Sequence, residues 1–239
     1  MKFVFGPLKS RRLGNSLGIN LTPHKICSFD CVYCQLGKTT LKTQERKEYV
    51  SLKDILNELK TWLESNSEEL KNINYITLSG SGEPTLNDKI KQLILEIKKL
   101  TSLPVAVLTN SSLLKSAVVR GEILAADLIV PSLDAVEKKV FLEIDRPQEN
   151  IEIEEIIEGL IALRREFKGK IWLEVMLVRG INDDIRYIKK LKKITDLINP
   201  DKIQLNSPVR TTSEPGVLSV DKKKLEKIQE ILGEKCEII

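Results

Sequence analysis

The sequence has no long apolar run and contains few of the residue types that bind metals or form disulfides. Its 239 residues include one histidine, four cysteines and two methionines, and aromatic residues make up 5%. No stretch of about 18 apolar residues occurs, so the sequence predicts no membrane-spanning helix. The apolar part of the N-terminal segment MKFVFGPLKSRR is too short for a secretory signal, and we therefore expect a cytoplasmic protein without a membrane partner.

The sequence also lacks a strong charge of either sign. Its 38 lysines and arginines are balanced by 34 aspartates and glutamates, which gives a formal net charge of +4. A mixed surface of this kind does not by itself indicate nucleic acid, although it leaves RNA open as a partner. We find no repeat, no low-complexity linker and no abrupt change in composition, so we expect a single domain over residues 1–239.

Short β-branched runs alternate with longer segments of helical period. The predicted strands are Leu17–Leu21, Asn74–Ser79, Val105–Thr109, Asp127–Pro131, Ile171–Val178 and Lys202–Asn206. The predicted helices are Leu52–Glu64, Asp88–Leu100, Leu113–Ala125, Ile153–Phe167, Ile185–Ile198 and Asp221–Leu232, with Ser51 and Asp221 as N-caps. This alternation predicts an α/β fold with a parallel sheet, either a partial barrel or an open doubly wound sheet. In both folds the ligand site lies beyond the carboxyl ends of the strands.

Three of the four cysteines lie within eight residues, in the segment Cys27-Ser-Phe-Asp-Cys31-Val-Tyr-Cys34. This CxxxCxxC spacing places three thiolates on one short loop after the first predicted strand. An iron–sulfur cubane normally takes four protein ligands, so three would leave one iron open. The competing interpretations are a zinc site completed by His24, and three unconnected buried cysteines. We expect Cys236 to be an ordinary buried thiol.

CxxxCxxC spacing with an aromatic residue, Tyr33, just before the last cysteine resembles the signature of the radical S-adenosylmethionine (SAM) superfamily. The resemblance implies a [4Fe–4S] cluster on Cys27, Cys31 and Cys34, whose open iron binds the amino and carboxylate groups of SAM. It further implies that one electron cleaves SAM to a 5′-deoxyadenosyl radical, which abstracts hydrogen from a substrate. By the same resemblance Tyr33 contacts the adenine, and a reductant such as flavodoxin or ferredoxin supplies the electron.

A second motif, Leu78-Ser-Gly-Ser-Gly-Glu83, follows the second predicted strand. Small residues there let the backbone approach a ligand closely, although a simple glycine-rich turn would have the same composition. The motif resembles the GGE-type segment that binds the SAM amino group in the superfamily. Gly80, Gly82 and Glu83 occupy the matching positions, with Ser81 inserted between the glycines.

Polar residues at three later strand ends match positions that reach the SAM ribose and carboxylate in the superfamily. They are Asn110, with its neighbour Ser111, and Ser132, Asp134 and Glu174. Polar residues after a strand also commonly cap the next helix, which leaves Asn110, Ser111 and Ser132 open to either role. Inward carboxylates need a partner, which favours ligand binding for Asp134 and Glu174. We expect Gln204 and Asn206 to face the same cavity.

Several arginines follow strands or flank the expected mouth of the sheet. A guanidinium group binds carboxylate or phosphate through paired hydrogen bonds, so two or three converging arginines would indicate an anionic substrate. For any single arginine, an ion pair with one of the many acidic residues is the simpler expectation. The candidates are Arg11, Arg12, Arg46, Arg146, Arg179 and Arg210.

Four further segments extend the resemblance over nearly the whole chain, to small radical SAM proteins related to the tRNA wyosine-base (4-demethylwyosine) synthases. The segments are Phe5–Gly18, Cys34–Gly37, Ser132–Ala135 and Asn206–Arg210. This resemblance implies a partial (β/α)6 TIM-like barrel. The synthases carry a second cluster on additional N-terminal cysteines. The present chain has no cysteine before Cys27, so neither that cluster nor the tRNA reaction is carried over.

The sequence therefore favours a radical SAM enzyme that acts on an unidentified substrate, such as a tRNA base, a nucleotide or another anionic small molecule. One alternative is an activating enzyme for a glycyl-radical protein. A large apolar patch at the mouth would favour such a protein partner, whereas a basic rim would favour RNA. Another alternative is a non-catalytic iron–sulfur carrier, which would not need the Gly80–Glu83 motif.

Overall fold

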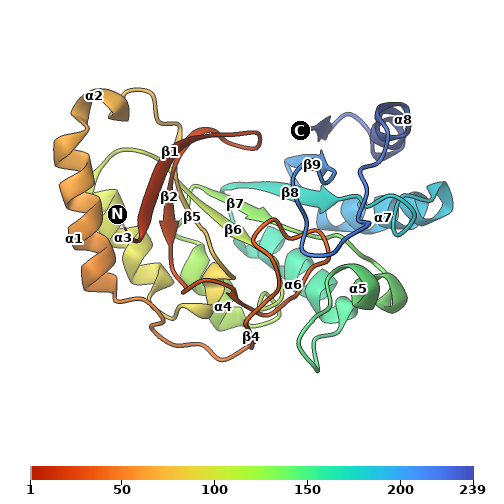
Figure 1. Cartoon of the computed structure of the whole chain (residues 1–239), viewed down its shortest axis with the longest axis horizontal. Helices are drawn as coiled ribbons and strands as arrows, with labels where there is room; N and C mark the ends of the chain where they lie inside the picture. The colour runs from red at the N-terminus through yellow and green to blue at the C-terminus, as the bar shows by residue number, and fades with distance from the viewer. Residues whose placement is uncertain (1) are drawn as a thin grey trace.

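A mostly parallel sheet of eight strands forms the centre of the computed structural model, which describes residues 2–239 (Figure 1). The strand order is β1-β2-β5-β6-β7-β8-β9-β10, antiparallel between β1 and β2 and parallel at the other pairings. The bounds are Val4–Ser10 (β1), Gly14–Asn20 (β2), Tyr75–Ser79 (β5), Val105–Thr109 (β6), Leu128–Pro131 (β7), Lys170–Met176 (β8), Lys202–Asn206 (β9) and Cys236–Ile238 (β10). A small second sheet pairs β3 (Ile26–Cys27) with β4 (Leu41–Lys42).

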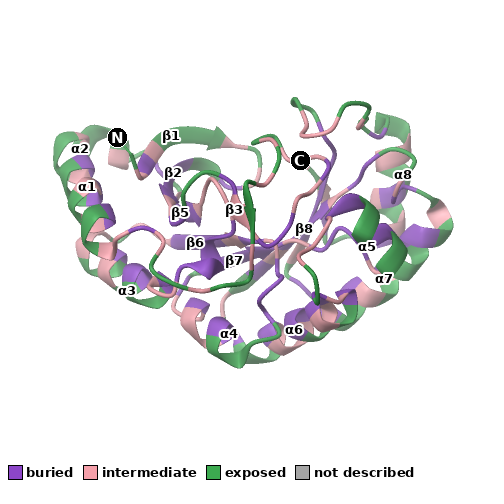
Figure 2. Cartoon of the chain, turned by 60° about the horizontal axis from the view of Figure 1, so that its bottom comes forward, coloured by how far each residue is buried: buried purple, intermediate pink, exposed green. Residues whose placement is uncertain are grey.

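The longer helices lie along the outside of the curved sheet, with their buried faces toward it (Figure 2). The helices are α1 (Leu52–Ser65), α2 (Ser67–Leu70), α3 (Ile90–Leu100), α4 (Ala117–Ile123), α5 (Lys138–Ile144), α6 (Ile153–Glu166), α7 (Ile185–Ile198) and α8 (Lys222–Leu232), with a 3-10 turn at Pro84–Leu86. Helical period explains this packing, since α1 buries Ile55, Leu59 and Trp62 on one face. Among the residues described, no helix combines the length and the apolar character that crossing a membrane requires.

All six predicted strands and all six predicted helices are present, with ends that differ by a few residues. Ser51 and Asp221 are N-caps as predicted, because their side chains accept hydrogen bonds from the first turns of α1 and α8. Helix α4 begins later than predicted, since Ser116 caps it. Within residues 2–239 no ladder joins β1 to β10, so the sheet stays open. The predicted α/β fold is confirmed as a partial barrel.

The inner face of the curved sheet is apolar at one end and polar at the other. Leu13, in the turn between β1 and β2, packs against apolar side chains of β6 and β7. Toward the carboxyl ends of the strands, the buried inner side chains include Glu174 and Asn206. Buried polar groups need hydrogen-bonding partners, so this end of the sheet is where a functional site is expected.

Candidate functional site

The three cysteines of the CxxxCxxC segment lie on the loop that follows β2, at the carboxyl edge of the sheet. Cys27 ends β3, and its carbonyl accepts a hydrogen bond from the Thr43 N–H at 3.0 Å. A turn links the other two, in which the Cys34 N–H donates to the Cys31 carbonyl at 3.1 Å. All three are free and half-buried, whereas Cys236 is buried in β10. The loop therefore carries three free cysteines on one short segment, each partly exposed.

This set of donors fits an iron–sulfur cubane better than a single metal ion. Among residues 2–239, no three His, Cys, Asp or Glu side chains converge closely enough to hold one ion. A cubane needs no such convergence, because each of its irons binds one thiolate. A zinc site would need a fourth ligand nearby, and His24, the only histidine of the chain, is exposed.

The thiols of Cys34 and Cys31 have different neighbours, one a base and the other an acid. The Lys25 ammonium group donates a hydrogen bond to the Cys34 sulfur at 3.1 Å. The Cys31 thiol instead donates to a carboxylate oxygen of Asp145 at 3.5 Å. Burial, and then Asp145, raise the pKa of Cys31 well above its ordinary value. Neither Lys25 nor Asp145 was predicted from the sequence.

The glycines of the second motif let its loop pack against the cysteine loop. A Cβ atom on Gly80 would lie 1.7 Å from the Asn20 side-chain oxygen, and one on Gly82 would lie 1.9 Å from the Ile26 carbonyl oxygen. Gly80 also has a φ of +114°, a conformation that favours glycine. The close approach that these glycines permit is thus to neighbouring protein, and it joins the two motifs into one unit.

Glu83 ties this unit to the end of β6. One carboxylate oxygen accepts hydrogen bonds from the Thr85 N–H at 3.0 Å, the Thr85 hydroxyl at 2.6 Å and the Thr109 hydroxyl at 2.7 Å. The other accepts from the Asn110 N–H at 2.7 Å. Burial raises the pKa of Glu83, and these hydrogen bonds oppose that shift. Both oxygens are therefore occupied within the protein.

The side chain of Asn110 turns toward the cysteine loop. Its amide nitrogen lies 3.5 Å from the Cys27 sulfur and donates to the Ser28 hydroxyl at 2.9 Å. Its oxygen accepts from the Ser112 N–H at 3.0 Å. Burial, and then Glu83, raise the pKa of Cys27 to about 11. Asn110, the residue that follows β6, thus reaches a thiol directly.

The polar residues that follow β6 and β7 do not cap the helices that come next in the chain. Ser116 is the N-cap of α4, and Glu137 precedes α5. The interpretation of Asn110, Ser111 and Ser132 as helix caps is therefore wrong. Helices α4 and α5 begin only after further turns of chain, which keeps these polar residues at the edge of the sheet.

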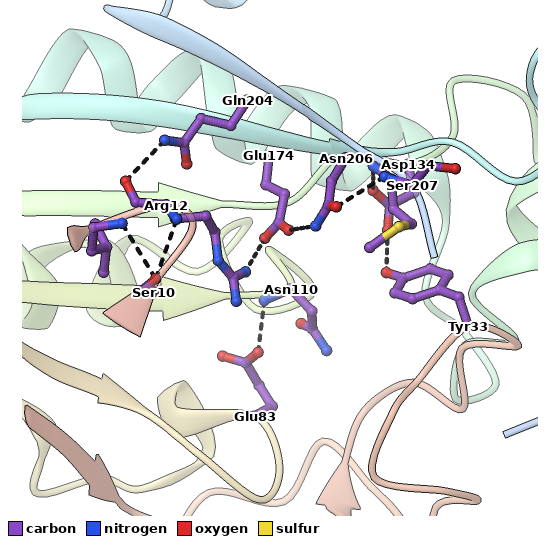
Figure 3. A network of polar contacts seen from close by, with 12 residues as sticks. Ser10, Arg12, Tyr33, Glu83, Asn110, Asp134, Glu174, Gln204, Asn206 and Ser207 are labelled. Carbon is purple, nitrogen blue, oxygen red and sulfur yellow. Dashed lines mark hydrogen bonds and ion pairs between the residues drawn. The ribbon is translucent and has the colours of Figure 1, made fainter. Parts of the chain in front are cut away.

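A buried acidic pair lies beside Tyr33. The Tyr33 hydroxyl donates to one oxygen of Asp134, and the other oxygen accepts from the Met176 N–H at 2.8 Å (Figure 3). Burial raises the pKa of both Asp134 and Asp145, and the charge of Asp134 raises that of Asp145 further. Two buried carboxyl groups without a cation are favoured in the neutral form in this way.

A small cavity brings several of the predicted ligand residues together. Its volume is about 10 Å³, which is room for about one water molecule and too small to enclose an organic cofactor. Its walls include Tyr33, Asn110, Ser132, Asp134 and Asp145. Four residues predicted to contact SAM, on the cysteine loop and after β6 and β7, thus converge at one point.

Glu174 belongs to a separate network on the inner face of the sheet (Figure 3). Arg12 donates to one of its oxygens, and the Asn206 amide donates to the other at 3.0 Å. The Gln204 amide holds the Arg12 carbonyl at 3.2 Å. The inward carboxylate does have the partner that its burial requires, and that partner is an arginine from the β1–β2 turn.

The six candidate arginines divide into local ion pairs and one group. Three form separate ion pairs, namely Arg46 with Glu122, Arg146 with Glu214 and Arg179 with Asp221, of which the Arg146–Glu214 pair adjoins the cysteine loop. Arg11, Arg12 and Arg210 form the group, since burial and the charges of Arg210 and Arg12 together lower the pKa of Arg11. Arg210 also donates to the Gln35 side chain on the cysteine loop at 2.9 Å.

Comparison with known proteins links this arrangement to one family. The sequence model of the radical SAM superfamily matches residues 21–191, which include both motifs. A UPF0026 protein of Methanocaldococcus jannaschii is 39% identical over 237 residues, which cover 98% of this chain and 73% of that protein. A protein of Brachyspira hyodysenteriae named GTPase Obg is 44% identical over 237 residues, 99% of this chain, but the match spans only 34% of its length.

A solved structure shares the fold at low sequence identity. The structure of TYW1 with a lysine–pyruvate adduct bound has a TM-score of 0.66 and is 19% identical. The match covers 92% of the present chain and 74% of the TYW1 chain. This likeness extends the agreement in architecture beyond the segment that carries the two motifs.

Proposed function

The chain belongs to the radical SAM superfamily, and from that premise we propose that it is an enzyme that cleaves SAM reductively at one [4Fe–4S] cluster. We propose Cys27, Cys31 and Cys34 as the cluster ligands and residues 1–239 as one radical SAM domain. The observation that carries the proposal is the cysteine loop, whose three free, half-buried thiols lie against the Gly80–Glu83 loop. Three thiolates leave one position of a cubane for another ligand.

The cofactors would bring the reactive chemistry, and the chain would position them. When bound, the cluster and SAM supply a 5′-deoxyadenosyl radical that abstracts hydrogen from the substrate. The electron would come from an external reductant such as flavodoxin or ferredoxin. The cysteine loop holds its thiols through its own turn and through contacts with the strand ends beside it.

We propose that the residues around the small cavity contact SAM. Tyr33, Asn110, Ser132 and Asp134 present polar groups there, next to the cysteine loop. Glu83 would act differently, because its hydrogen bonds already occupy both carboxylate oxygens. Its role in this proposal is to position Asn110 and the loop that carries Gly80 and Gly82.

Glu174 would also act through a neighbour. Both of its oxygens are occupied, by Arg12 and Asn206, so it aims the Arg12 guanidinium group along the inner face of the sheet. Arg12 makes one side-chain hydrogen bond, to Glu174, and a guanidinium group has five N–H donors. The remaining donors can bind a ligand on this face.

The proposed activity can be tested with purified protein. After anaerobic reconstitution of the cluster and reduction with dithionite, added SAM should yield 5′-deoxyadenosine. Cys31→Ala should lose both the cluster absorbance and the product, because a three-thiolate site does not survive the loss of one ligand. Cys236→Ala is the matched control, since it removes the thiol in β10 and should keep both.

A carrier without catalytic activity makes the opposite prediction for the same experiment. It would hold the cluster, with its full absorbance, and release no 5′-deoxyadenosine on reduction in the presence of SAM. That result with the wild-type protein would overturn the proposed activity.

For the substrate, we propose an anionic molecule such as a nucleotide or a tRNA base. Arg11, Arg12 and Arg210 lie near one another, and the charge of Arg12 is offset by Glu174. Two further guanidinium groups are then available to a carboxylate or a phosphate. Mass spectrometry of RNA nucleosides and metabolites from a gene-deletion strain and its parent should reveal the missing product.

A second candidate is an activating enzyme for a glycyl-radical protein. Leu36 and Val209 are exposed on the two segments that the Gln35–Arg210 hydrogen bond joins, which would suit a protein partner. If this candidate is correct, the deletion strain should show unchanged nucleosides. A partner protein should then acquire a glycyl radical, visible by electron paramagnetic resonance (EPR), only when the enzyme and SAM are present.

A further inference from the structure

Lys25 is an unusual residue of the cysteine loop, because its side chain is buried. It is only 3% exposed, although lysine is almost never fully buried unless its charge is paired. Its backbone has a φ of +56°, which is uncommon for a residue other than glycine. Hydrogen bonds hold it there, since its N–H donates to the Ser81 carbonyl at 2.5 Å and its carbonyl accepts from the Thr40 N–H at 3.0 Å.

The buried charge of Lys25 is directed at a sulfur atom. Its ammonium group lies 3.1 Å from the Cys34 sulfur. In the part of the chain that the structure describes, no carboxylate forms an ion pair with Lys25. Its charge also acts on Cys27, whose pKa it lowers against the effects of burial and of Glu83. A buried cation without a carboxylate requires another anion, and the Cys34 sulfur becomes one when it binds iron as a thiolate.

We propose that Lys25 is a positioning residue for the cluster ligand Cys34 and raises the reduction potential of the cluster. The inference rests on the proposed function, because it assumes a cluster on the three cysteines. Reduction adds one electron, taken from a low-potential donor, and therefore one negative charge to the cluster. A buried positive charge and a hydrogen bond to a ligand sulfur both favour the more negative state.

The carboxyl group beside Cys31 makes this effect selective for one side of the loop. Asp145 accepts from the Cys31 thiol, so it offers no positive charge to the cluster there. The sulfurs of Cys34 and Cys31 are hydrogen-bonded to Lys25 and Asp145, and only Lys25 is a cation. Replacing it should therefore leave no other positive charge in contact with either sulfur.

The test is an EPR-monitored redox titration of anaerobically reconstituted protein. At the wild-type midpoint potential, Lys25→Met should shift the ratio of oxidised to reduced cluster at least tenfold toward the oxidised form. For one electron this corresponds to a midpoint lower by about 59 mV. Lys25→Arg, which keeps the charge and the donors, should restore most of the wild-type value. Lys38→Met removes a charge from an exposed lysine four residues after Cys34 and should change nothing.

Each outcome decides the proposal. A fully loaded Lys25→Met protein with an unchanged midpoint would overturn it. If Lys25→Met and Lys25→Gln cannot hold a cluster but Lys25→Arg can, the positive charge is required at Cys34 and the positioning role is supported. If all three variants lose the cluster, the role is steric and the proposal fails. Formation of 5′-deoxyadenosine by the wild type is a separate measurement, so the proposed function can fail while a shifted midpoint still supports Lys25.

Discussion

Two thiols only three residues apart on one loop lie in opposite electrostatic surroundings. Cys34 accepts a hydrogen bond from the buried ammonium group of Lys25, whereas Cys31 donates one to the buried carboxyl group of Asp145. The acidic side extends to Asp134, which binds the Tyr33 hydroxyl. Charges buried in this way interact far more strongly than they would in water.

The difference shows which side of the loop requires an anion. The carboxyl groups of Asp134 and Asp145 can become neutral, as their raised pKa values indicate, and so need no cation. The ammonium group of Lys25 has no such carboxyl partner, and its hydrogen-bond acceptor is the Cys34 sulfur. Three ordinary neutral thiols would leave this charge without an anion. The Lys25 contact therefore favours an iron-bound thiolate at Cys34, whereas burial raises the pKa of the Cys27 and Cys31 thiols.

The largest effect should come from reversing the charge at Cys34. Lys25→Glu places a buried carboxylate on both sides of the loop, so we expect the unfolding free energy to fall by about 3–5 kcal/mol. Reconstitution should give no cluster. Lys38→Glu is the control, because the Lys38 side chain is 70% exposed and its loss should cost less than about 1 kcal/mol. Urea unfolding measures the stability, and iron content after reconstitution measures the cluster. Equal losses in Lys25→Glu and Lys38→Glu would show that the charge at Lys25 has no special role.

Removing each thiol in turn separates the contribution of Lys25 from that of Asp145. Cys34→Ala and Cys31→Ala should both lose the cluster. In the cluster-free protein, however, Cys34→Ala should lower the unfolding free energy by about 2–3 kcal/mol more, because it leaves the ammonium group of Lys25 without an acceptor. Urea unfolding of the two variants side by side measures the difference. A larger loss for Cys31→Ala would show that the acidic side, not Lys25, depends on its thiol.

The fold could be predicted because its pattern is local. The outer helices repeat their apolar residues at helical spacing, and the parallel strands are β-branched runs between them. Two of the missed strands lack such a pattern. β1 contains Gly6 and Pro7 and is mostly exposed, and β10 has only three residues. Both lie at the edges of the sheet, where pairing with a single neighbour imposes little on the sequence.

The site could be predicted only where chain order reveals it. Residues that directly follow parallel strands meet at one edge, which is why Asn110, Ser132 and Asp134, named from the resemblance, line the same small cavity. The charges that distinguish the thiols depend on tertiary contacts instead. Asp145 lies 114 residues from Cys31 in sequence. Lys25 is close to Cys34 in sequence, but only the left-handed turn at Lys25 and its burial show that its charge points inward.

A smaller effect should appear on the acidic side as the pH changes. The pKa of Asp145 is raised by folding, so its contribution to stability is present below the unfolded pKa near 4 and is lost as the pH rises through the folded value. Asp145→Asn removes this titration. In the cluster-free protein the variant should therefore gain stability relative to wild type as the pH rises from 5 to 8. Urea unfolding at both pH values measures the gain.

The control for this prediction is Asp196→Asn, which changes an exposed aspartate that pairs with Lys192 on α7. It should show the same small difference from wild type at pH 5 and at pH 8. If Asp145→Asn shows the same difference at both pH values, Asp145 is ionised between pH 5 and pH 8. The acidic side of the loop would then carry a charge that needs a cation.

The smallest effect should come from Tyr33→Phe, which removes the hydroxyl that binds Asp134. One oxygen of Asp134 keeps its hydrogen bond from the Met176 N–H at 2.8 Å, so the loss of stability should be about 1 kcal/mol. The Tyr33 hydrogen bond lowers the pKa of Asp134, which burial raises to about 7. Without it the pKa should rise further, and NMR titration of the carboxyl carbon should show ionisation at higher pH. A downward shift would mean that Tyr33 stabilises the neutral acid, and the acidic side would then depend on Tyr33 rather than on burial.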